Sequence, residues 1–246
     1  MKSDDETVGR VLTRREILTM LGATGVLWLA RCSEPGSIAK SAAGEVASGC
    51  VVKPQLTAGP YFVDGALERS DIRADPATGE VSAGTPLDLR FQVSRIAEGA
   101  CVPLAGAVVD VWHCDARGVY SDVEDPSFDT QGRKFLRGYQ VTDADGAARF
   151  TTIYPGWYRG RAVHVHFKVR SAPEAVPGFD FTSQLFFDDE LSDRVHEQEP
   201  YAANGARDRR NSGDGIFRQG GPALVLALEP ADPGYAGTFD IALQDV

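Results

Sequence analysis

Histidine and cysteine are scarce in this chain of 246 residues, which contains four of each. The cysteines never occur at the close paired spacing of zinc ribbons or zinc fingers. The His-Glu-x-x-His helix motif of zinc metalloproteases is also missing. These absences exclude the common structural and hydrolytic zinc centres, so a metal site in this chain needs other ligands.

Basic residues are also fewer than acidic ones. The chain has 35 acidic and 25 basic residues, and its formal net charge is −10. Such a charge repels phosphate backbones, and we therefore expect no nucleic-acid partner. An anionic small substrate is still allowed, because one local arginine can override the overall field inside a pocket.

Long apolar runs are missing too. The run from Ile17 to Ala30 is shorter than the roughly 20 residues that a membrane-spanning helix needs. Because Arg14-Arg15 precedes this run, residues 1–31 are interpreted as a twin-arginine export signal, with a buried helix or a membrane anchor as the alternatives. We expect a periplasmic or extracellular protein with no stable membrane span once the signal is removed.

The segment after the signal, residues 32–49, is small and polar and is predicted to be a linker to a single domain at residues 50–246. A lipid anchor at Cys32 is the less favoured alternative, because Arg31 stands where a lipoprotein signal has a small residue. An oxidising compartment would permit one disulfide among Cys50, Cys101 and Cys114, whose pairing the sequence leaves open.

The domain has the pattern of an all-β protein. Apolar alternation and β-branched or aromatic residues predict strands at Leu87–Val93, Ala107–Trp112, Phe135–Thr142, Ala148–Ile153, Val163–Val169, Ser183–Phe187, Ala223–Leu228 and Thr238–Leu243. Turn signals separate these segments, which favours a β-sandwich. The polar stretch Tyr201–Gly215 is predicted to be a surface excursion.

Two histidines share one predicted strand. His164 and His166 point to the same face, because side chains alternate along a strand, and Val165 points to the opposite face. Two such imidazoles can bind one metal ion, although solvated strand histidines give the same pattern. A glycine-rich turn that ends in Tyr158 precedes the pair and favours the metal site.

The surrounding residues limit which metal this would be. No carboxylate lies beside the histidine pair, as an iron(II) site with two histidines and one carboxylate would require. Tyrosine is the remaining ligand type. Its pKa of about 10 means that only a strongly acidic cation holds it as phenolate near neutral pH. Ferric iron suits this role better than zinc.

The sequence resembles the intradiol ring-cleavage dioxygenases, the family of protocatechuate 3,4-dioxygenase and catechol 1,2-dioxygenase. Within that family it is most similar to the small exported members. The matching blocks are Thr57-Ala58-Gly59-Pro60-Tyr61, Trp112-x(5)-Gly118-x-Tyr120, Pro155-Gly156-x-Tyr158, Arg161, His164-x-His166 and Thr182-Ser183-Gln184-Leu185-Phe186-Phe187. They occur in order and cover about residues 50–190.

The resemblance implies a site and a reaction. Tyr120, Tyr158, His164 and His166 would bind Fe(3+), and Tyr158 would also leave the metal during catalysis. Arg161 and Gln184 would be catalytic, and Tyr61 with Arg161 would line the substrate pocket. The reaction would be cleavage of a catechol-type aromatic by O2 to a cis,cis-muconate-type product. The implied fold is a two-sheet β-sandwich of prealbumin-like topology, with long loops forming the active site.

Two departures from the family limit what the resemblance implies. The stretch between Tyr158 and His164 is shorter than in the cytoplasmic enzymes, which leaves the accepted catechol open. The helical dimerisation segment of the catechol 1,2-type enzymes has no counterpart, so no oligomeric state is predicted.

Two other interpretations stay open. Segments such as Pro103–Val109 also occur in prealbumin-like adhesive domains, so a non-catalytic exported β-sandwich binding module is the alternative function. A cupin-type oxygenase would also use His-x-His, but needs a further carboxylate and a distant histidine. We expect no metal role for His113 or His196, a turn-capping role for Asp115, and a core position for Trp112.

Overall fold

The computed structural model describes residues 50–172 and 178–244, which belong to one compact unit. The predicted export signal at residues 1–31, the linker at residues 32–49 and the lipidation candidate Cys32 lie outside the described residues. Within the described part, no helix is long and apolar enough to cross a membrane.

Strands dominate the described regular structure. The strands are β1 (Pro86–Ala97), β2 (Ala100–Pro103), β3 (Val108–Trp112), β4 (Glu124–Asp125), β5 (Phe128–Asp129), β6 (Arg137–Val141), β7 (Ala147–Ile153), β8 (His164–Arg170), β9 (Asp180–Phe186), β10 (Glu229–Pro230) and β11 (Tyr235–Leu243). Helix α2 (Asp189–His196) and the 3-10 helices η1 (Tyr201–Asn204), η2 (Asn211–Gly213), η3 (Phe217–Gln219) and η4 (Gly221–Leu224) lie between β9 and β10.

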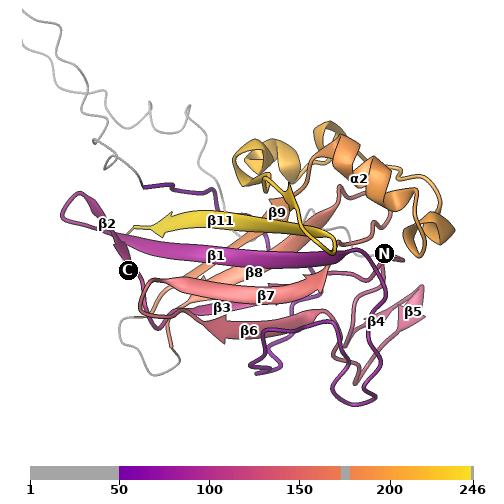
Figure 1. The fold of residues 1–246 in the computed structure, drawn as a ribbon, viewed down its shortest axis with the longest axis horizontal. Coiled ribbons are helices and arrows are strands. Elements are labelled where there is room, and N and C mark those ends of the chain that lie inside the picture. The colour runs from indigo at the N-terminus through magenta and orange to yellow at the C-terminus, as the bar shows by residue number, and fades with distance from the viewer. Residues whose placement is uncertain (1–49, 173–177, 245–246) are drawn as a thin grey trace, which may run out of the picture. The chain divides into compact units, whose positions relative to one another are not determined.

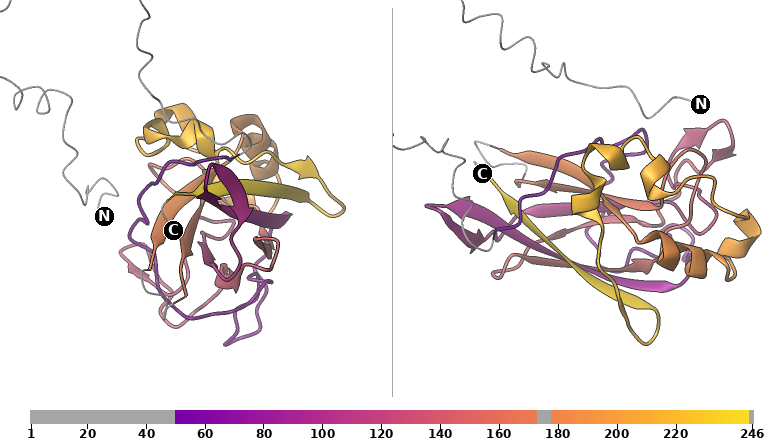
Figure 2. Two further views of the ribbon diagram at one scale, coloured as in Figure 1. Left: turned by 90° about the vertical axis from the view of Figure 1, so that its left-hand side faces the viewer. Right: turned by 90° about the horizontal axis from the view of Figure 1, so that it is seen from above.

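Two larger sheets form the body of the unit. In the first, β1 runs parallel to β11 along one edge and antiparallel to β7 and β2 along the other, while β10 extends the sheet beyond β11. The second is antiparallel in the order β6-β3-β8-β9. Figure 1 shows β11, β1 and β7 in front of β8, β3 and β6, and the helical segments gather at one end, as Figure 2 also shows.

Aromatic side chains from both sheets meet in one core. The ring of Phe167 on β8 lies 5.2 Å from that of Phe91 on β1 and 5.3 Å from that of Phe239 on β11, measured between centroids. Burial of each such ring stabilises the fold by about 1.5–3 kcal/mol. The mostly-β prediction is confirmed, and the prealbumin-like topology stays a prediction.

Strands form at the predicted segments between residues 87 and 187 and again near the C-terminal end. The predicted strand Ala223–Leu228 is wrong, because residues 221–224 form η4 and Val225 makes only an isolated bridge to Phe186. Gly220 and Pro222 favour this tight turn over an extended ladder. Leu224 is nevertheless fully buried, so its apolar character reflects packing rather than strand pairing.

The segment Tyr201–Gly215 is mostly exposed or partly buried, as the prediction of a surface excursion requires, but two of its residues, Tyr201 and Asp214, are buried. Tyr201 is fully buried, and its hydroxyl donates to the carbonyl of Tyr154 at 2.7 Å. Arg207 forms ion pairs with Asp189 and Asp193 of α2. Some of its residues therefore anchor the segment to the rest of the fold, which composition alone does not reveal.

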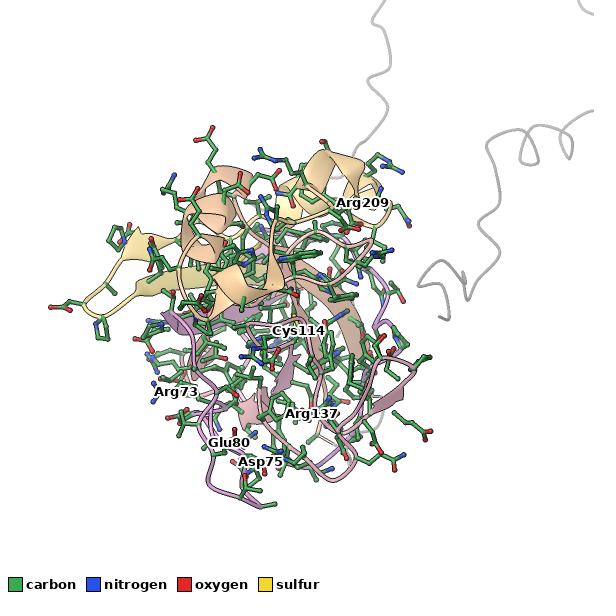
Figure 3. All side chains as sticks on the ribbon, turned by 90° about the vertical axis from the view of Figure 1, so that its right-hand side faces the viewer. Arg73, Asp75, Glu80, Cys114, Arg137 and Arg209 are labelled. Atoms are coloured by element: carbon green, nitrogen blue, oxygen red, sulfur yellow. A yellow bond between two sulfur atoms is a disulfide. The ribbon has the colours of Figure 1, made fainter. Side chains whose placement is uncertain are left out.

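The cysteine pairing that the sequence left open is Cys50 with Cys101, whose Cα atoms lie 5.4 Å apart. This disulfide ties the start of the described chain to β2. Cys114 is a free, buried thiol, labelled inside the structure in Figure 3, and it contacts the carbonyl of Gly156 at 3.6 Å.

Candidate metal centre

Strand β8 provides two of the predicted metal ligands. Val165 and Phe167 point from this strand into the core, and His164 and His166 point together to the opposite face. Both imidazoles are almost completely buried. The alternation expected from the sequence therefore holds, and it places two ring nitrogens side by side.

The two tyrosines come from turns that pack against each other. Asp115 caps the first turn, as predicted, by accepting hydrogen bonds from the backbone N–H groups of Arg117 and Val119, both at 2.9 Å. Gly118 has a φ of +82°, and a Cβ atom there would collide with the carbonyl of Trp157 in the second turn. A glycine at position 118 is thus what allows the two turns to approach each other.

Four polar atoms converge at one point. The hydroxyl oxygens of Tyr120 and Tyr158 lie 3.4 Å and 3.3 Å from Nε2 of His164, and Nε2 of His166 lies 3.0 Å from the same atom. Two ligand atoms that each lie about 2.1 Å from one ion, about 90–110° apart, are separated by about 3.0–3.4 Å. The spacing therefore fits four ligands of a single metal ion.

Both imidazoles are held in place by their surroundings. His164 donates its Nδ1–H to the carbonyl of Ala162 at 2.7 Å, which leaves the Nε2 lone pair facing the other three groups. The ring of His166 stacks on the indole of Trp112 with a centroid distance of 5.0 Å and an interplanar angle of 5°. On its other side lies Gly59, where a Cβ atom would stand 3.2 Å from the imidazole.

The electrostatics of the site suit a highly charged cation. Burial lowers the pKa values of His164 and His166 well below the ordinary value, so both rings are neutral and available as ligands. Burial also raises the pKa of Tyr120 well above that of a free phenol. Ionising this phenol therefore requires a strong positive charge beside its oxygen, which a bound ferric ion would supply.

Arg161 and Gln184 lie against this group. Nη1 of Arg161 donates to the hydroxyl of Tyr158 at 3.4 Å, and its Nη2 donates to Oε1 of Gln184 at 2.6 Å. Nε2 of Gln184 donates in turn to the carbonyl of Thr57 at 2.9 Å. A positive charge is thus fixed next to the more accessible of the two tyrosines.

Tyr61 covers the other tyrosine. Its ring stacks on that of Tyr120 with a centroid distance of 4.5 Å, and its hydroxyl donates to a carboxylate oxygen of Asp125 at 2.9 Å. The structure therefore brings all seven sequence-predicted site residues into one neighbourhood.

The other two histidines stand apart from this centre. His113 bonds the carbonyl of Cys114 at 2.8 Å and the hydroxyl of Thr152 at 2.7 Å, while His196 bonds the carbonyl of Pro155 at 3.0 Å. Among the described residues, no group of three or more His, Cys, Asp or Glu side chains is placed to hold a metal ion. The carboxylate-containing iron(II) and cupin-type sites therefore have no counterpart in the described part of the chain.

Comparison with known proteins shows the family of the chain. The Dioxygenase family model matches residues 57–208. The chain belongs to the intradiol ring-cleavage dioxygenase family. It is 34% identical over 149 residues to the chlorocatechol 1,2-dioxygenase of Pseudomonas sp. (strain P51), a match that covers 53% of each protein. The chain thus spans about half the length of the curated relatives it matches.

Solved structures of the family match more completely. An intradiol ring-cleavage dioxygenase from Tetranychus urticae superposes with a TM-score of 0.70 at 27% identity, covering 80% of this chain and 96% of that one. The dioxygenase domain of a dioxygenase–carbohydrate-binding fusion protein from Streptomyces sp. SirexAA-E gives a TM-score of 0.56 at 31% identity, covering 79% and 99%. A non-catalytic binding module is not favoured by these relatives.

One buried residue of the site region escaped the sequence analysis. Asp214 is fully buried and accepts a hydrogen bond from Nε of Arg161 at 2.9 Å. It lies beyond the matched segment and inside a stretch that the sequence presented as polar surface. Its position between glycines, at Gly213 and Gly215, gave only a turn signal.

Proposed function

We propose that this chain binds ferric iron through Tyr120, Tyr158, His164 and His166 and uses it to open the ring of a catechol-type substrate with O2, giving a cis,cis-muconate-type product. The observation that carries the proposal is that two phenol oxygens and Nε2 of His166 all lie within 3.0–3.4 Å of Nε2 of His164. Hard phenolate and borderline imidazole ligands together suit Fe(3+).

When bound, the ferric ion would take both oxygens of the catechol and draw electron density from the ring, which makes it reactive towards O2. The protein's own groups then have separate tasks. The carbonyl of Ala162 orients the His164 ring, and the stack on Trp112 orients the His166 ring. Neither imidazole therefore has to turn before it can bind the metal ion.

The two tyrosines differ in exposure, and this difference supports different roles. Tyr120 is fully buried beneath Tyr61, whereas Tyr158 is only partly buried. Tyr158 therefore stands on the side from which a substrate arrives. The phenolate oxygen of Tyr158 would give up its place to a substrate oxygen and take the proton that this substrate hydroxyl loses. It would do so next to the guanidinium of Arg161.

Arg161 would stabilise negative charge that develops on the substrate, as a fixed cation in a dry site does. Gln184 accepts from Arg161 and donates to the carbonyl of Thr57, which orients the guanidinium. Tyr61 would form one wall of the substrate pocket, because its ring stacks on Tyr120.

Oxygen uptake tests this function directly. Iron-loaded protein is offered protocatechuate, catechol, hydroxyquinol and chlorinated catechols under ¹⁸O2. We expect uptake with at least one of them and a ring-opened dicarboxylic acid that contains both labelled atoms. His113→Gln is the matched control, because it alters a buried histidine outside the site. Full iron occupancy without uptake for any catechol would contradict the proposal.

We also propose export through the twin-arginine signal at residues 1–31 to a periplasmic or extracellular location. The disulfide between Cys50 and Cys101 supports this, because disulfides persist in oxidising compartments. Replacing Arg14 and Arg15 by lysine should retain the chain inside the cell. Mass spectrometry of the mature N-terminus checks cleavage and tests for an acyl group on Cys32.

A further inference from the structure

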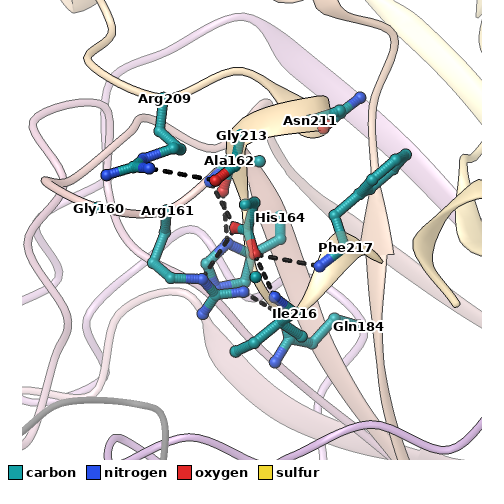
Figure 4. A network of polar contacts seen from close by, with 12 residues as sticks. Gly160, Arg161, Ala162, His164, Gln184, Arg209, Asn211, Gly213, Ile216 and Phe217 are labelled. Carbon is teal, nitrogen blue, oxygen red and sulfur yellow. Dashed lines mark hydrogen bonds and ion pairs between the residues drawn. The ribbon is translucent and has the colours of Figure 1, made fainter. Parts of the chain in front are cut away.

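Asp214 is a fully buried carboxylate in the segment that links η2 to η3. Figure 4 shows a polar network that includes its partners Arg161, Ala162, Ile216 and Phe217. The residue lies outside the part of the chain that the family model matches. Its contacts nevertheless reach two functional groups of the metal centre.

Four N–H donors surround this carboxylate. Oδ1 accepts from the backbone N–H groups of Ile216 at 2.7 Å and Phe217 at 3.0 Å, which anchors Asp214 in its own turn. Oδ2 accepts from Nε of Arg161 at 2.9 Å and from the backbone N–H of Ala162 at 2.7 Å. Because all four partners are donors, both carboxylate oxygens act as acceptors only.

The bond to Arg161 fixes a guanidinium that also has two other contacts. With Nε held by Asp214 and Nη2 by Gln184, the plane of the guanidinium is set and Nη1 is left facing the Tyr158 hydroxyl. The side chain of Arg161 is 7% exposed and that of Asp214 is 0% exposed. A charge pair this dry is poorly screened, so loss of one partner disturbs the other strongly.

The bond to Ala162 reaches the metal ligand itself. The N–H of Ala162 donates to Asp214, and its carbonyl accepts from Nδ1 of His164 at 2.7 Å. Asp214 therefore bonds the backbone of the residue whose carbonyl sets the orientation and tautomer of a ligand imidazole.

We propose that Asp214 is a positioning residue for the dioxygenase reaction. It holds the Arg161 guanidinium against Tyr158 and Gln184, and it fixes the backbone of Ala162, whose carbonyl orients His164. The kinetic effects expected for this inference rest on the proposed function. The position that it gives to the Arg161 guanidinium can be tested without enzyme turnover.

Asp214→Asn is the first test. Asparagine can keep its one oxygen for Ile216 and Phe217, and it then presents an NH2 group, which is a donor, to the Nε–H of Arg161. In iron-loaded protein we expect kcat to fall about 100-fold with KM changed less than about threefold, because Arg161 acts on charge that develops during the reaction. An unchanged kcat would overturn the proposal.

A double-mutant cycle shows whether the effect passes through Arg161. In an Arg161→Gln background, Asp214→Asn should lower kcat by less than about threefold, because the group that it positions is gone. A further 100-fold loss in that background would contradict the assignment.

Asp110→Asn is the matched control. Asp110 is also largely buried and accepts from Nε of Arg170 at 2.8 Å and from its Nη2 at 3.2 Å, at the far end of β8 from the histidines. The Asp110→Asn substitution therefore alters another arginine-bound carboxylate, one that lies on β3 and pairs with an arginine on β8. We expect kcat to stay within about twofold of wild type, and an equal loss would reduce the Asp214 effect to general destabilisation.

An NMR measurement needs neither turnover nor a folded Asp214 variant. In the full chain before iron is added, the Nε–H signal of Arg161, identified by its loss in Arg161→Lys, should exchange slowly with solvent. A fast-exchanging Arg161 Nε–H would overturn the inference even if the enzyme is active. A protected signal in a protein that opens no catechol would leave the geometry standing and refute the proposed function instead.

Discussion

The two faces of strand β8 are chemically opposite, and both are buried over its first four residues. Val165, Phe167 and Val169 are fully buried in the core between the sheets, and on the reverse face His164 and His166 are 2% and 1% exposed. The apolar face is stabilised by packing alone. The histidine face is stable only because each ring has specific partners, so burial there serves the site rather than the fold.

His164→Ala is expected to have the largest effect on iron binding and activity. The substitution changes the histidine face of β8 and leaves the apolar face intact. Without this central imidazole, iron content should fall below about one tenth of wild type and activity should vanish, because even loss of a group that orients a ligand costs about 10–100-fold in metal affinity, and loss of the ligand itself removes a bond to the metal. Iron analysis and circular dichroism check the result. Full iron content in a folded His164→Ala protein would refute the ligand assignment.

Phe167→Ala removes a buried ring from the apolar face of β8. Its ring contacts Phe91 and Phe239, so truncation should lower the free energy of unfolding by about 3–5 kcal/mol through lost burial and a cavity. The protein that remains folded should still bind iron with wild-type stoichiometry. Urea unfolding of both proteins measures the loss, and a change below about 1 kcal/mol would contradict the shared core.

Tyr158→Phe sharpens the difference between the two tyrosines. We expect iron to be retained and kcat/KM to fall about 10–100-fold, because the accessible phenol that handles the proton is lost. Tyr154→Phe is the control, since its hydroxyl bonds Ser192 at 2.7 Å away from the ligands. Equal losses in the two variants would argue against a specific role for Tyr158.

His113 provides a smaller, pH-dependent comparison, because it is a buried histidine that bonds Thr152 across the core. Burial lowers its pKa from 6.5 to about 4. The unfolded chain therefore binds this proton first, and the stabilisation present above pH 6.5 is lost as the pH falls towards 4. The loss between pH 7 and pH 5 should be about 2 kcal/mol.

Thermal unfolding of iron-free wild type and His113→Gln across this range measures the difference. The variant should show a shallower loss of stability on acidification, by about that amount. Parallel curves for the two proteins would mean that His113 is not the group responsible.

Sequence reasoning succeeded where information is local. Strand alternation put His164 and His166 on one face, and the block spacing selected Tyr120 and Tyr158 from the seven tyrosines. It failed where a residue's role depends on a distant partner. Asp214 bonds Arg161 across 53 positions of sequence, and Cys50 pairs with Cys101 across 51. Neither partnership leaves a periodic or spaced signal.

The error at Ala223–Leu228 has a related cause. An apolar run predicts burial well, and Leu224 and Leu226 are indeed buried. A short buried run pairs as a strand only if a neighbouring strand is available and no residue such as Pro222 prevents the pairing. Hydrophobic periodicity contains no information on either condition. Burial was thus predictable here and pairing was not.

Visible absorption of the iron-loaded protein tests the central claim most directly. Two tyrosinates on one ferric ion should give a burgundy charge-transfer band that changes in Tyr120→Phe and in Tyr158→Phe but persists in Tyr154→Phe. A fully iron-loaded wild-type protein without colour, or a band that neither ligand substitution alters, would contradict the four-ligand ferric centre.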